Sequence, residues 1–257
     1  DCVDFTKRPV SLGEGGACTL TLCYLSGMVK MERVSDYVLR PLAQDEALAR
    51  CGTPRQAMDR MKDGALYNLS AEERTRLDAA VFDLVNGCCL LLFPGESSVL
   101  SLNVGTEEKR SISSPSNETV LKGSRDAFVE SLRTNTSIVR RHLKAPELRI
   151  REQVVGRQSV TSVDILYIEG LTNPHLVEQV AAQLADIDID AVLATGNIEE
   201  YIVPAARTAF PLVQYTERSD RFCAGLAEGR VGILIDGLPL GYLAPGVLGD
   251  FLQAPQD

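Results

Sequence analysis

Short apolar runs bounded by glycine and proline predict the β-strands in the first half of this chain. Residues 3–10 and 17–25 have the composition of two strands, and a glycine-rich turn separates them. Residues 88–93 are almost entirely apolar and end at a Pro-Gly turn, after which residues 98–104 return. These four segments predict the strands of a first small sheet.

Helical patterns lie between these strands, at residues 30–39, 53–64 and 70–87. The first helix is expected to close before Pro41, because proline disfavours helical backbone in the residue before it. Thr53 has the character of a capping residue and is followed by proline at the first helical position. Ser70 and Glu73 have the spacing of a capping box, with apolar residues at helical spacing after them. The first half therefore predicts strands flanked by three helices.

The second half repeats this order of elements. One predicted strand begins at Leu148, and three others cover residues 160–168, 212–215 and 231–235. The predicted helices begin at Asn173, Asn197 and Ser219. The anchors of the repeat are the pairs Tyr24 and Tyr167, Gly27 and Gly170, Gly87 and Gly229, and Gly95 and Gly237. The first two pairs are 143 residues apart and the other two are 142 apart. The fold class predicted is α/β, as two related lobes with small mixed sheets flanked by helices.

The domain boundaries follow from composition. Residues 1–104 form the first predicted lobe, and 105–120 are rich in Ser, Gly, Pro and charge, which is typical of a linker. Residues 121–257 form the second predicted lobe, which includes a long basic helix at 125–143 with Ser124 as its cap. The length of 257 residues suits one large or two small domains.

Two charged clusters are candidates for contacts. Arg133, Arg140 and Lys144 share a stripe of the predicted long helix, with Arg141 beside it. This stripe is either a solvated face or a docking surface for an acidic partner, a neighbouring subunit or anionic headgroups. The second cluster, at 217–221, follows a predicted strand; it is either a set of ion pairs at a helix start or a ligand or subunit contact.

Composition excludes several classes of function. A net charge of −9 and an aromatic content of 5% without Trp argue against nucleic-acid binding, which needs clustered positive charge or stacking platforms. No apolar run approaches the ~20 residues that a membrane helix needs, so these residues are not expected to span a bilayer themselves. The chain lacks an initiator Met and opens almost inside a strand pattern, so we expect it to be a piece of a longer protein.

Catalytic and metal-binding motifs are not found in the sequence. Seven Cys without a Cys-x-x-Cys pair, and only two His, predict a reducing compartment and no zinc site. The phosphate-binding loop, the nucleophile elbow and the His-Glu-x-x-His motif are missing. Residues 186–190 resemble the start of a calcium loop, but Ala191 stands where the glycine is required. We therefore expect no cofactor, no metal and no enzymatic activity.

Six sequence blocks, in order, resemble the A subunit of spore germinant receptors, the GerA family, which includes the stage V sporulation protein AF paralogue. The blocks are KGSRDAFVE at 122–130, NTSIVRR at 135–141, YIEG at 167–170, IDID at 187–190, FPLVQYTER at 210–218 and EGRVGILIDG at 228–237. The Gly-Ser-Arg-Asp run at 123–126 is slightly more similar to the AF branch. Ser219 stands where the family usually has Pro, and Ser can still begin a helix.

The resemblance implies a subunit of the spore inner membrane, with this region on the cytoplasmic, spore-core side. It also implies B- and C-type receptor subunits and copies of the same chain as partners, and a ligand-gated ion channel as the assembly. Membrane helices are expected beyond Asp257. The residues expected at subunit contacts or facing a ligand are Arg125, Asp126, Arg133, Arg140, Arg141, Lys144, Glu169, Glu217, Arg218, Asp220, Arg221 and Asp236.

Three hypotheses of function follow, of which the third is an enzyme. The first is a non-enzymatic domain that couples germinant sensing to channel opening through subunit assembly. The second is a module that binds a small-molecule germinant between two lobes, as two-lobed α/β folds do. An α/β enzyme would require titratable groups clustered in one pocket.

Overall fold

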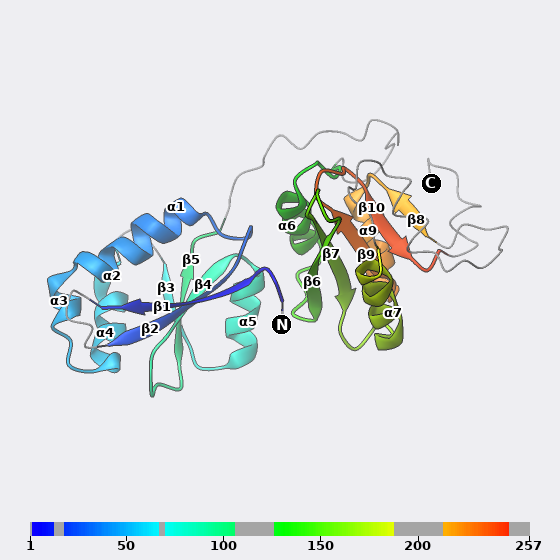
Figure 1. Ribbon diagram of the computed structural model, residues 1–257. Helices are drawn as coiled ribbons and strands as arrows, with labels where there is room; N and C mark the ends of the chain where they lie inside the picture. Colours follow the sequence, from blue (N-terminus) through cyan, green and yellow to red (C-terminus); the bar gives the residue numbers. More distant parts are fainter. Residues whose placement is uncertain (1, 13–17, 67–69, 106–125, 188–212, 247–257) are drawn as a thin grey trace. The chain divides into compact units, whose positions relative to one another are not determined.

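The computed structural model describes residues 2–12, 18–66, 70–105, 126–187 and 213–246 (Figure 1). The chain divides into two compact units, one of residues 4–108 and the other of residues 109–257 together with residues 1–3. The amide of Val3 donates to the carbonyl of Ile150 at 3.0 Å, which ties this short N-terminal piece to the second unit. Most of the predicted linker, from residue 106 on, and the helix predicted at Asn197 lie outside the described residues.

The first unit is a five-stranded sheet with helices on both faces. Its strands are β1 (Phe5–Ser11), β2 (Thr19–Leu25), β3 (Ala71–Arg74), β4 (Cys88–Leu92) and β5 (Val99–Asn103), in the order β1-β2-β4-β5-β3. Its helical segments are α1 (Met31–Val34), η1 (Ser35–Leu39), α2 (Arg40–Gln44), α3 (Glu46–Ala49), α4 (Pro54–Arg60), η2 (Met61–Ala65) and α5 (Leu77–Val85). The segments from α1 to η2 bury one core with one sheet face, and α5 covers the other face.

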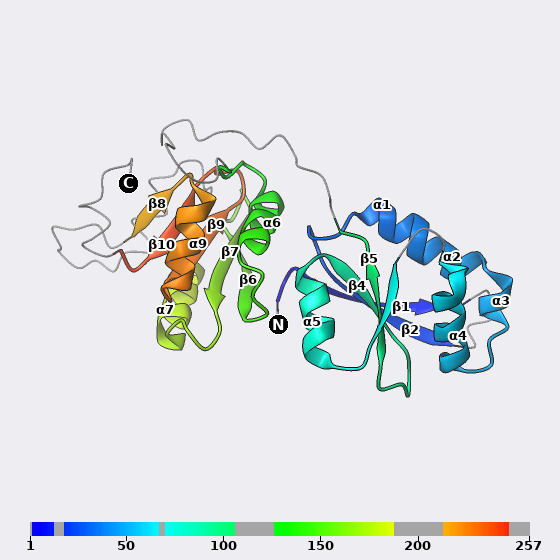
Figure 2. The same ribbon diagram turned by 180° about the vertical axis from the view of Figure 1, so that it is seen from behind.

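The described residues of the second unit also form a five-stranded sheet with helices on both faces. Its strands are β6 (Leu148–Val155), β7 (Thr161–Ile168), β8 (Gln214–Thr216), β9 (Val231–Ile235) and β10 (Gly241–Ala244), in the order β6-β7-β9-β10-β8. Its described helices are α6 (Leu132–His142), α7 (Pro174–Ala185) and α9 (Ser219–Ala227). Helix α7 packs on one sheet face, and α6 and α9 share the other, as Figure 2 shows from behind.

The predicted internal repeat is present in the topology. Both sheets have the same strand order once β1 to β5 are matched with β6, β7, β8, β9 and β10 in chain order. The anchor glycines also match in conformation. Gly27 and Gly170 have φ of 82° and 83°, and Gly87 and Gly229 have φ of 90° and 88°, so each pair makes the same left-handed turn. The α/β fold class is confirmed, whereas every strand pairing described is antiparallel, so the sheets are not mixed.

The prediction of a helix over 125–143 is wrong at its start. The helix begins at Leu132, and the side chain of Ser131 accepts a hydrogen bond from the amide of Thr134. Residues before it are extended, because Ala127 pairs as an antiparallel bridge with Arg218 and the ring of Phe128 is buried. A tertiary pairing thus replaces the helical turns that the local pattern suggested.

Two predictions in the first unit are also corrected. The capping-box pattern at Ser70 does not open a helix: Ala71–Arg74 is the edge strand β3, which pairs with β5. The helix at 30–39 does not close before Pro41 but continues to Gln44 through a π-helical turn, in which the amide of Arg40 donates to the carbonyl of Ser35. Because a proline lacks an N–H, this wider turn accommodates Pro41 at the start of α2.

Candidate functional site

The second unit brings the predicted charged residues together where α9 begins. The amide of Phe128 donates to the carbonyl of Glu217 at 2.9 Å, and the amide and the hydroxyl of Ser219 both donate to the carbonyl of Asp126, at 3.3 and 2.9 Å. The ring of Phe128 stacks edge-on against Phe222 at 5.2 Å between centroids. The extended stretch before α6 therefore lies across the first turn of α9.

An ion pair spans the N-terminus of α9. The guanidinium of Arg218 donates two hydrogen bonds to the carboxylate of Asp220, at 3.1 and 2.8 Å, and the Arg218 side chain is 9% exposed. Burial alone would raise the pKa of Asp220, but the hydrogen bonds from Arg218 and from the amide of Arg221 hold this pKa below its usual range. The carboxylate is also favoured by its place in the first turn of a helix. The pair is therefore charged at neutral pH.

His142, Ser219 and Asp126 lie together but do not form a catalytic triad. Nε2 of His142 is 3.2 Å from the hydroxyl of Ser219 and 3.6 Å from the carboxylate of Asp126. In a triad the carboxylate and the hydroxyl contact opposite nitrogens of the imidazole ring, whereas here both approach the same one. The Ser219 hydroxyl already donates to a carbonyl, and the residue is fully buried. The contact serves packing between α6 and α9.

The start of α6 holds a second charged group. Arg133 donates to Glu152 at 2.7 Å and to Asp164 at 3.4 Å, and the hydroxyl of Thr136 donates to the same oxygen of Asp164 at 3.0 Å. Asp236 accepts from the amide of Leu132 at 3.1 Å, which satisfies a free amide of the helix N-terminus. Burial would raise the pKa of Glu152, but hydrogen bonds from Arg133 and Ser162 hold it below its usual range.

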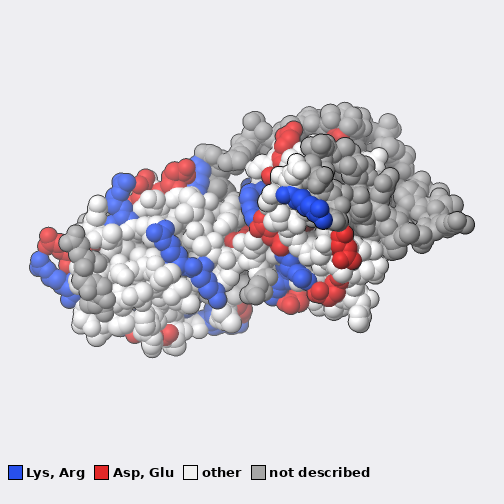
Figure 3. All heavy atoms as spheres, viewed as in Figure 1, with Lys and Arg blue, Asp and Glu red and all other residues white. Residues whose placement is uncertain are grey.

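The basic residues predicted on one stripe of α6 differ in exposure. Arg140 is 3% exposed, and its guanidinium lies 3.0 Å from Sγ of Cys2, whereas Arg133, Arg141 and Lys144 are exposed. Glu169, directly after β7, accepts a hydrogen bond from Arg149 at 2.6 Å. Arg125 lies outside the described residues. On the face drawn in Figure 3, basic and acidic side chains of the second unit lie next to one another.

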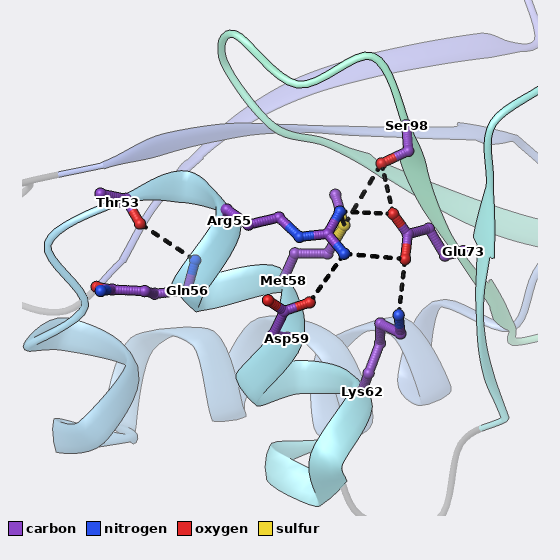
Figure 4. Close-up of polar contacts among 8 residues, drawn as sticks. All are labelled: Thr53, Arg55, Gln56, Met58, Asp59, Lys62, Glu73 and Ser98. Atoms are coloured by element: carbon purple, nitrogen blue, oxygen red, sulfur yellow. Dashed lines mark hydrogen bonds and ion pairs between the residues drawn. The ribbon is translucent and has the colours of Figure 1, made fainter.

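One polar cluster in the first unit was not predicted. Glu73 on β3 accepts hydrogen bonds from Arg55 at 2.6 Å, Lys62 at 2.6 Å and Ser98 at 2.8 Å (Figure 4). These three hydrogen bonds lower the pKa of Glu73 to about 2. Arg55, Asp59 and Lys62 recur every three to four residues on one helix face, which is the signal that could have indicated the cluster. The cluster joins the α4–η2 segment to the sheet edge.

Metal-binding groups and buried thiols were considered as reactive centres among the described residues. Among them no group of three His, Cys, Asp or Glu side chains is placed to hold a metal ion. Burial raises the pKa of Cys89 and that of Cys223 to about 12, so these thiols are not ionised nucleophiles at neutral pH. No helix within the described ranges has both the length and the apolar character of a membrane span. The site therefore consists of ion pairs held in place by packed helices and strands.

Comparison with known proteins gives a consistent result. The family model for the Bacillus/Clostridium GerA spore germination protein matches residues 1–257. Spore germination protein KA of Bacillus subtilis (strain 168) is 32% identical over 254 residues, which is 99% of this chain and 46% of that protein. The uncharacterized membrane protein YfkQ of the same organism is 33% identical over 100% of this chain and 48% of its own length. The chain thus spans about half the length of these curated relatives.

A solved structure has the same fold. It is the N-terminal domain of the A subunit of the Bacillus megaterium spore germinant receptor GerK3, with a TM-score of 0.74 and 28% sequence identity. The match covers 96% of this chain and 90% of that domain. Both units and their antiparallel sheets therefore belong to one recognised architecture.

Proposed function

Because this chain belongs to the GerA family of spore germination proteins, we propose that it couples germinant sensing to the opening of an ion channel, through contacts within a receptor complex. In this proposal the chain is the N-terminal region of an A-type subunit. It assembles with B- and C-type subunits and with further copies of itself. The match to the GerK3 A-subunit domain over 96% of the chain is the observation that carries the proposal.

We also propose where this region lies in the spore. The parent protein sits in the spore inner membrane, through segments outside these 257 residues, and this region lies on the cytoplasmic side. The length of the curated relatives, about twice that of this chain, supports additional segments, and one of these relatives is named a membrane protein. The role is non-enzymatic, since fixed ion pairs on a packed scaffold suit a contact surface better than a reaction centre.

The exposed end of α6 and the segment at 217–221 are the proposed contact surface. Arg141 and Lys144 are exposed, and the loop before α9 presents Glu217 beside the Arg218–Asp220 pair. Arg140 is buried behind this surface, Asp236 accepts from the amide of Leu132 at the start of α6, and the carbonyl of Asp126 accepts from Ser219 at the start of α9. We also assign Arg133 and Arg221 to this surface, and Glu169, which pairs with Arg149 after β7, to a separate contact. A protein partner with alternating charge would fit this surface, because charge complementarity fixes the register of two surfaces.

The test reverses two exposed charges in the full-length parent protein, in spores of its own organism. We expect Arg141→Glu combined with Lys144→Glu to slow germinant-triggered ion release several-fold, with unchanged amounts of the protein in the membrane fraction. The matched control, Arg50→Glu with Arg157→Glu, makes the same change in net charge at exposed positions elsewhere. Normal ion release in the first variant would contradict the proposed contact surface.

A further inference from the structure

Helix α5 ends in a turn that contains an Asn-Gly pair. Asn86 follows Val85, the last residue of the helix, and Gly87 comes next with φ of 90°, a left-handed conformation that glycine adopts easily. This is the one Asn-Gly pair in the sequence of 257 residues. The pair has a chemical consequence, because a glycine has no Cβ to hinder the attack of its amide nitrogen on the side-chain carbonyl carbon of the asparagine before it.

In the folded chain both reacting groups are engaged in hydrogen bonds. The side-chain amide of Asn86 donates to the carbonyl of Phe82 at 2.8 Å, and the amide of Gly87 donates to the carbonyl of Leu84 at 3.2 Å. The attack requires the nitrogen of Gly87 to turn toward Cγ of Asn86, and these two bonds hold the groups in other directions. The reaction therefore waits until the last turn of α5 opens, and helix ends open more readily than helix interiors.

Gly87 lies against the end of the described part of the first unit. A Cβ at Gly87 would stand 2.8 Å from the carbonyl oxygen of Met28 and 3.2 Å from Cα of Gly105, so that side of the turn has no room for an additional atom. Gly105 pairs with Val29 as an antiparallel bridge, and its carbonyl accepts a hydrogen bond from Arg33 at 3.0 Å. The Asn-Gly turn thus supports the backbone where the chain leaves β5.

The second unit has the same turn without the reactive side chain. Gly229 has φ of 88° and follows α9 as Gly87 follows α5. The residue before it is Glu228, which stands where Asn86 stands in the first unit. A glutamate has no amide nitrogen to lose, so the conformation of this turn does not require an asparagine.

We propose that Asn86 and Gly87 form a site of spontaneous covalent modification, which converts Asn86 to aspartate or isoaspartate and opens the contact between Gly105 and Val29. The amide nitrogen of Gly87 attacks Cγ of Asn86, the bond from Cγ to Nδ2 breaks, and ammonia leaves with the amide proton of Gly87. Water then opens the succinimide ring at one of its two carbonyls, with no oxidation or reduction. The inference does not depend on the proposed receptor function.

Isoaspartate is the product that disturbs the turn. Both products place a negative charge at the C-terminal end of α5, which the helix dipole disfavours, but the second unit carries Glu228 at the same position. Isoaspartate in addition leads the main chain through its Cβ, which adds one backbone atom directly before Gly87. Because Gly87 is confined by Met28 and Gly105, the added atom displaces the segment that pairs with Val29.

The first test measures where ammonia is lost. The full-length parent protein is kept in a warm, mildly alkaline buffer, either in isolated membranes or unfolded in urea with detergent, and its peptides are followed by mass spectrometry. We expect Asn86 to convert before every other asparagine in both samples, and at least about tenfold more slowly in the folded protein. Labelling by a protein isoaspartyl methyltransferase identifies isoaspartate, and Asn86→Gln is the control that removes the signal. If Asn86→Gln does not fold, Asn86→Glu, which copies Glu228, takes its place.

The second test measures the effect of the modification on the first unit. The amide of Lys30 donates to the carbonyl of Val104 at 3.1 Å, next to the bridge between Val29 and Gly105. We expect hydrogen exchange at Lys30 to be at least about tenfold faster in the isoaspartate form than in fresh protein. Repair of isoaspartate to aspartate by the same methyltransferase should restore the slow rate, and Asn86→Asp should exchange as slowly as the wild type.

Three outcomes would overturn the proposal. Conversion of another asparagine before Asn86 in the folded protein means that this turn is not the modification site. Equal rates at Asn86 in membranes and in urea mean that the turn does not control the reaction. Unchanged exchange at Lys30 in protein that contains isoaspartate at position 86 means that the modification does not open the end of the first unit.

Discussion

At the scale of single residues, the two units use the same ion pair in two environments. Arg76 and Asp78, like Arg218 and Asp220, 142 positions later, join a guanidinium to a carboxylate in the first turn of a helix. The first pair is exposed to solvent and the second is mostly buried. Exposed pairs contribute little to stability, whereas removal of one member of a buried pair leaves an uncompensated charge.

This difference predicts unequal effects of the same substitution. Arg218→Ala should lower the free energy of unfolding by about 2 kcal/mol, because Asp220 then loses its partner in a partly buried place. Arg76→Ala is the matched control and should leave stability unchanged. Urea denaturation of both variants, followed by circular dichroism, measures the difference. Equal effects would contradict the assignment of the second pair as buried and structural.

Glu73 predicts a pH dependence of stability. Hydrogen bonds from Arg55, Lys62 and Ser98 lower its pKa to about 2 in the folded state, from an ordinary value of 4.5. A carboxyl whose pKa is lowered by folding stabilises the folded state above its unfolded pKa, and this contribution is lost as the pH falls toward its folded pKa. Glu73→Gln should therefore cost about 1–2 kcal/mol at pH 7 and progressively less between pH 4.5 and 2.

The control for this prediction is Glu46→Gln. Glu46 is 83% exposed and pairs with Arg50 one turn away, so its substitution should not change the free energy of unfolding. Unfolding curves at several pH values between 2 and 7 provide the comparison. A constant difference between wild type and Glu73→Gln over this range would disprove the assigned pKa.

At the scale of secondary-structure elements, both units have the same contact between a helix and a strand, but the large and the small residue of that contact are on opposite elements in the two units. Helix α9 presents the large Phe222 to Gly232 on β9, and a Cβ at Gly232 would collide with the Phe222 ring. In α5 the equivalent helix residue is the small Ala80, and the equivalent strand residue is the large Leu90. Each unit therefore places one large and one small residue at this contact, on opposite elements.

This exchange predicts a non-additive pair of substitutions. Gly232→Leu should destabilise the second unit by about 1–3 kcal/mol through overpacking, and Phe222→Ala by about 3–5 kcal/mol through a cavity. The double variant should lose less than the sum by about 0.5–3 kcal/mol, because Leu fills the space that Phe leaves. Gly232→Leu combined with Met58→Ala, a buried site of the first unit, is the additive control. Additivity in both combinations would refute the volume exchange.

The elements also show which structural features the sequence could indicate. The helix predicted at Ser219 is present as α9, and the strand predicted over 231–235 is β9. Both were predictable because a glycine marks the end of α9 and another marks the turn after β9, so that the local sequence alone indicates where each element ends. The start of α6 was not predicted because Ala127 pairs with Arg218, the residue directly before α9 and 91 positions later, which no local pattern contains. Edge strand β3 was missed because its Glu-Glu-Arg run resembles a helix start, and only its partners on α4 and β5 make it a strand.

The sequence indicated which charged residues form the candidate site, but not which of their side chains are buried. The group at 217–221 was expected to be charged, and its ion pair is present. The four basic residues of α6 were expected on one face, yet the structure buries Arg140 against Cys2, at the other end of the chain. Helical spacing gives the direction of a side chain but not which distant segment covers it. Contact roles for these residues stay predictions that the germination experiment addresses.

At the scale of the whole molecule, two units with separate cores admit both assembly and ligand binding. Each unit closes its own sheet with helices on both faces, so neither depends on the other for its core. A domain made of units with separate cores suits the transmission of changes of contact between subunits. Two units with separate cores also suit a module that binds a small molecule. The assembly proposal does not require such binding.

Thermal unfolding of the chain separates these two functions. A ligand that binds only the folded state stabilises it by about 2.7 kcal/mol at a concentration of 100 times Kd, which raises Tm measurably. The assembly proposal predicts an unchanged Tm with amino acids, nucleosides or dipicolinate at millimolar concentration. Arg218→Ala and Glu73→Gln, which lower stability by known mechanisms, establish that the measurement detects changes of this size. A saturable rise in Tm with one of these compounds would instead favour the binding module. A compound that binds the folded state raises Tm with its concentration according to its Kd, by mass action.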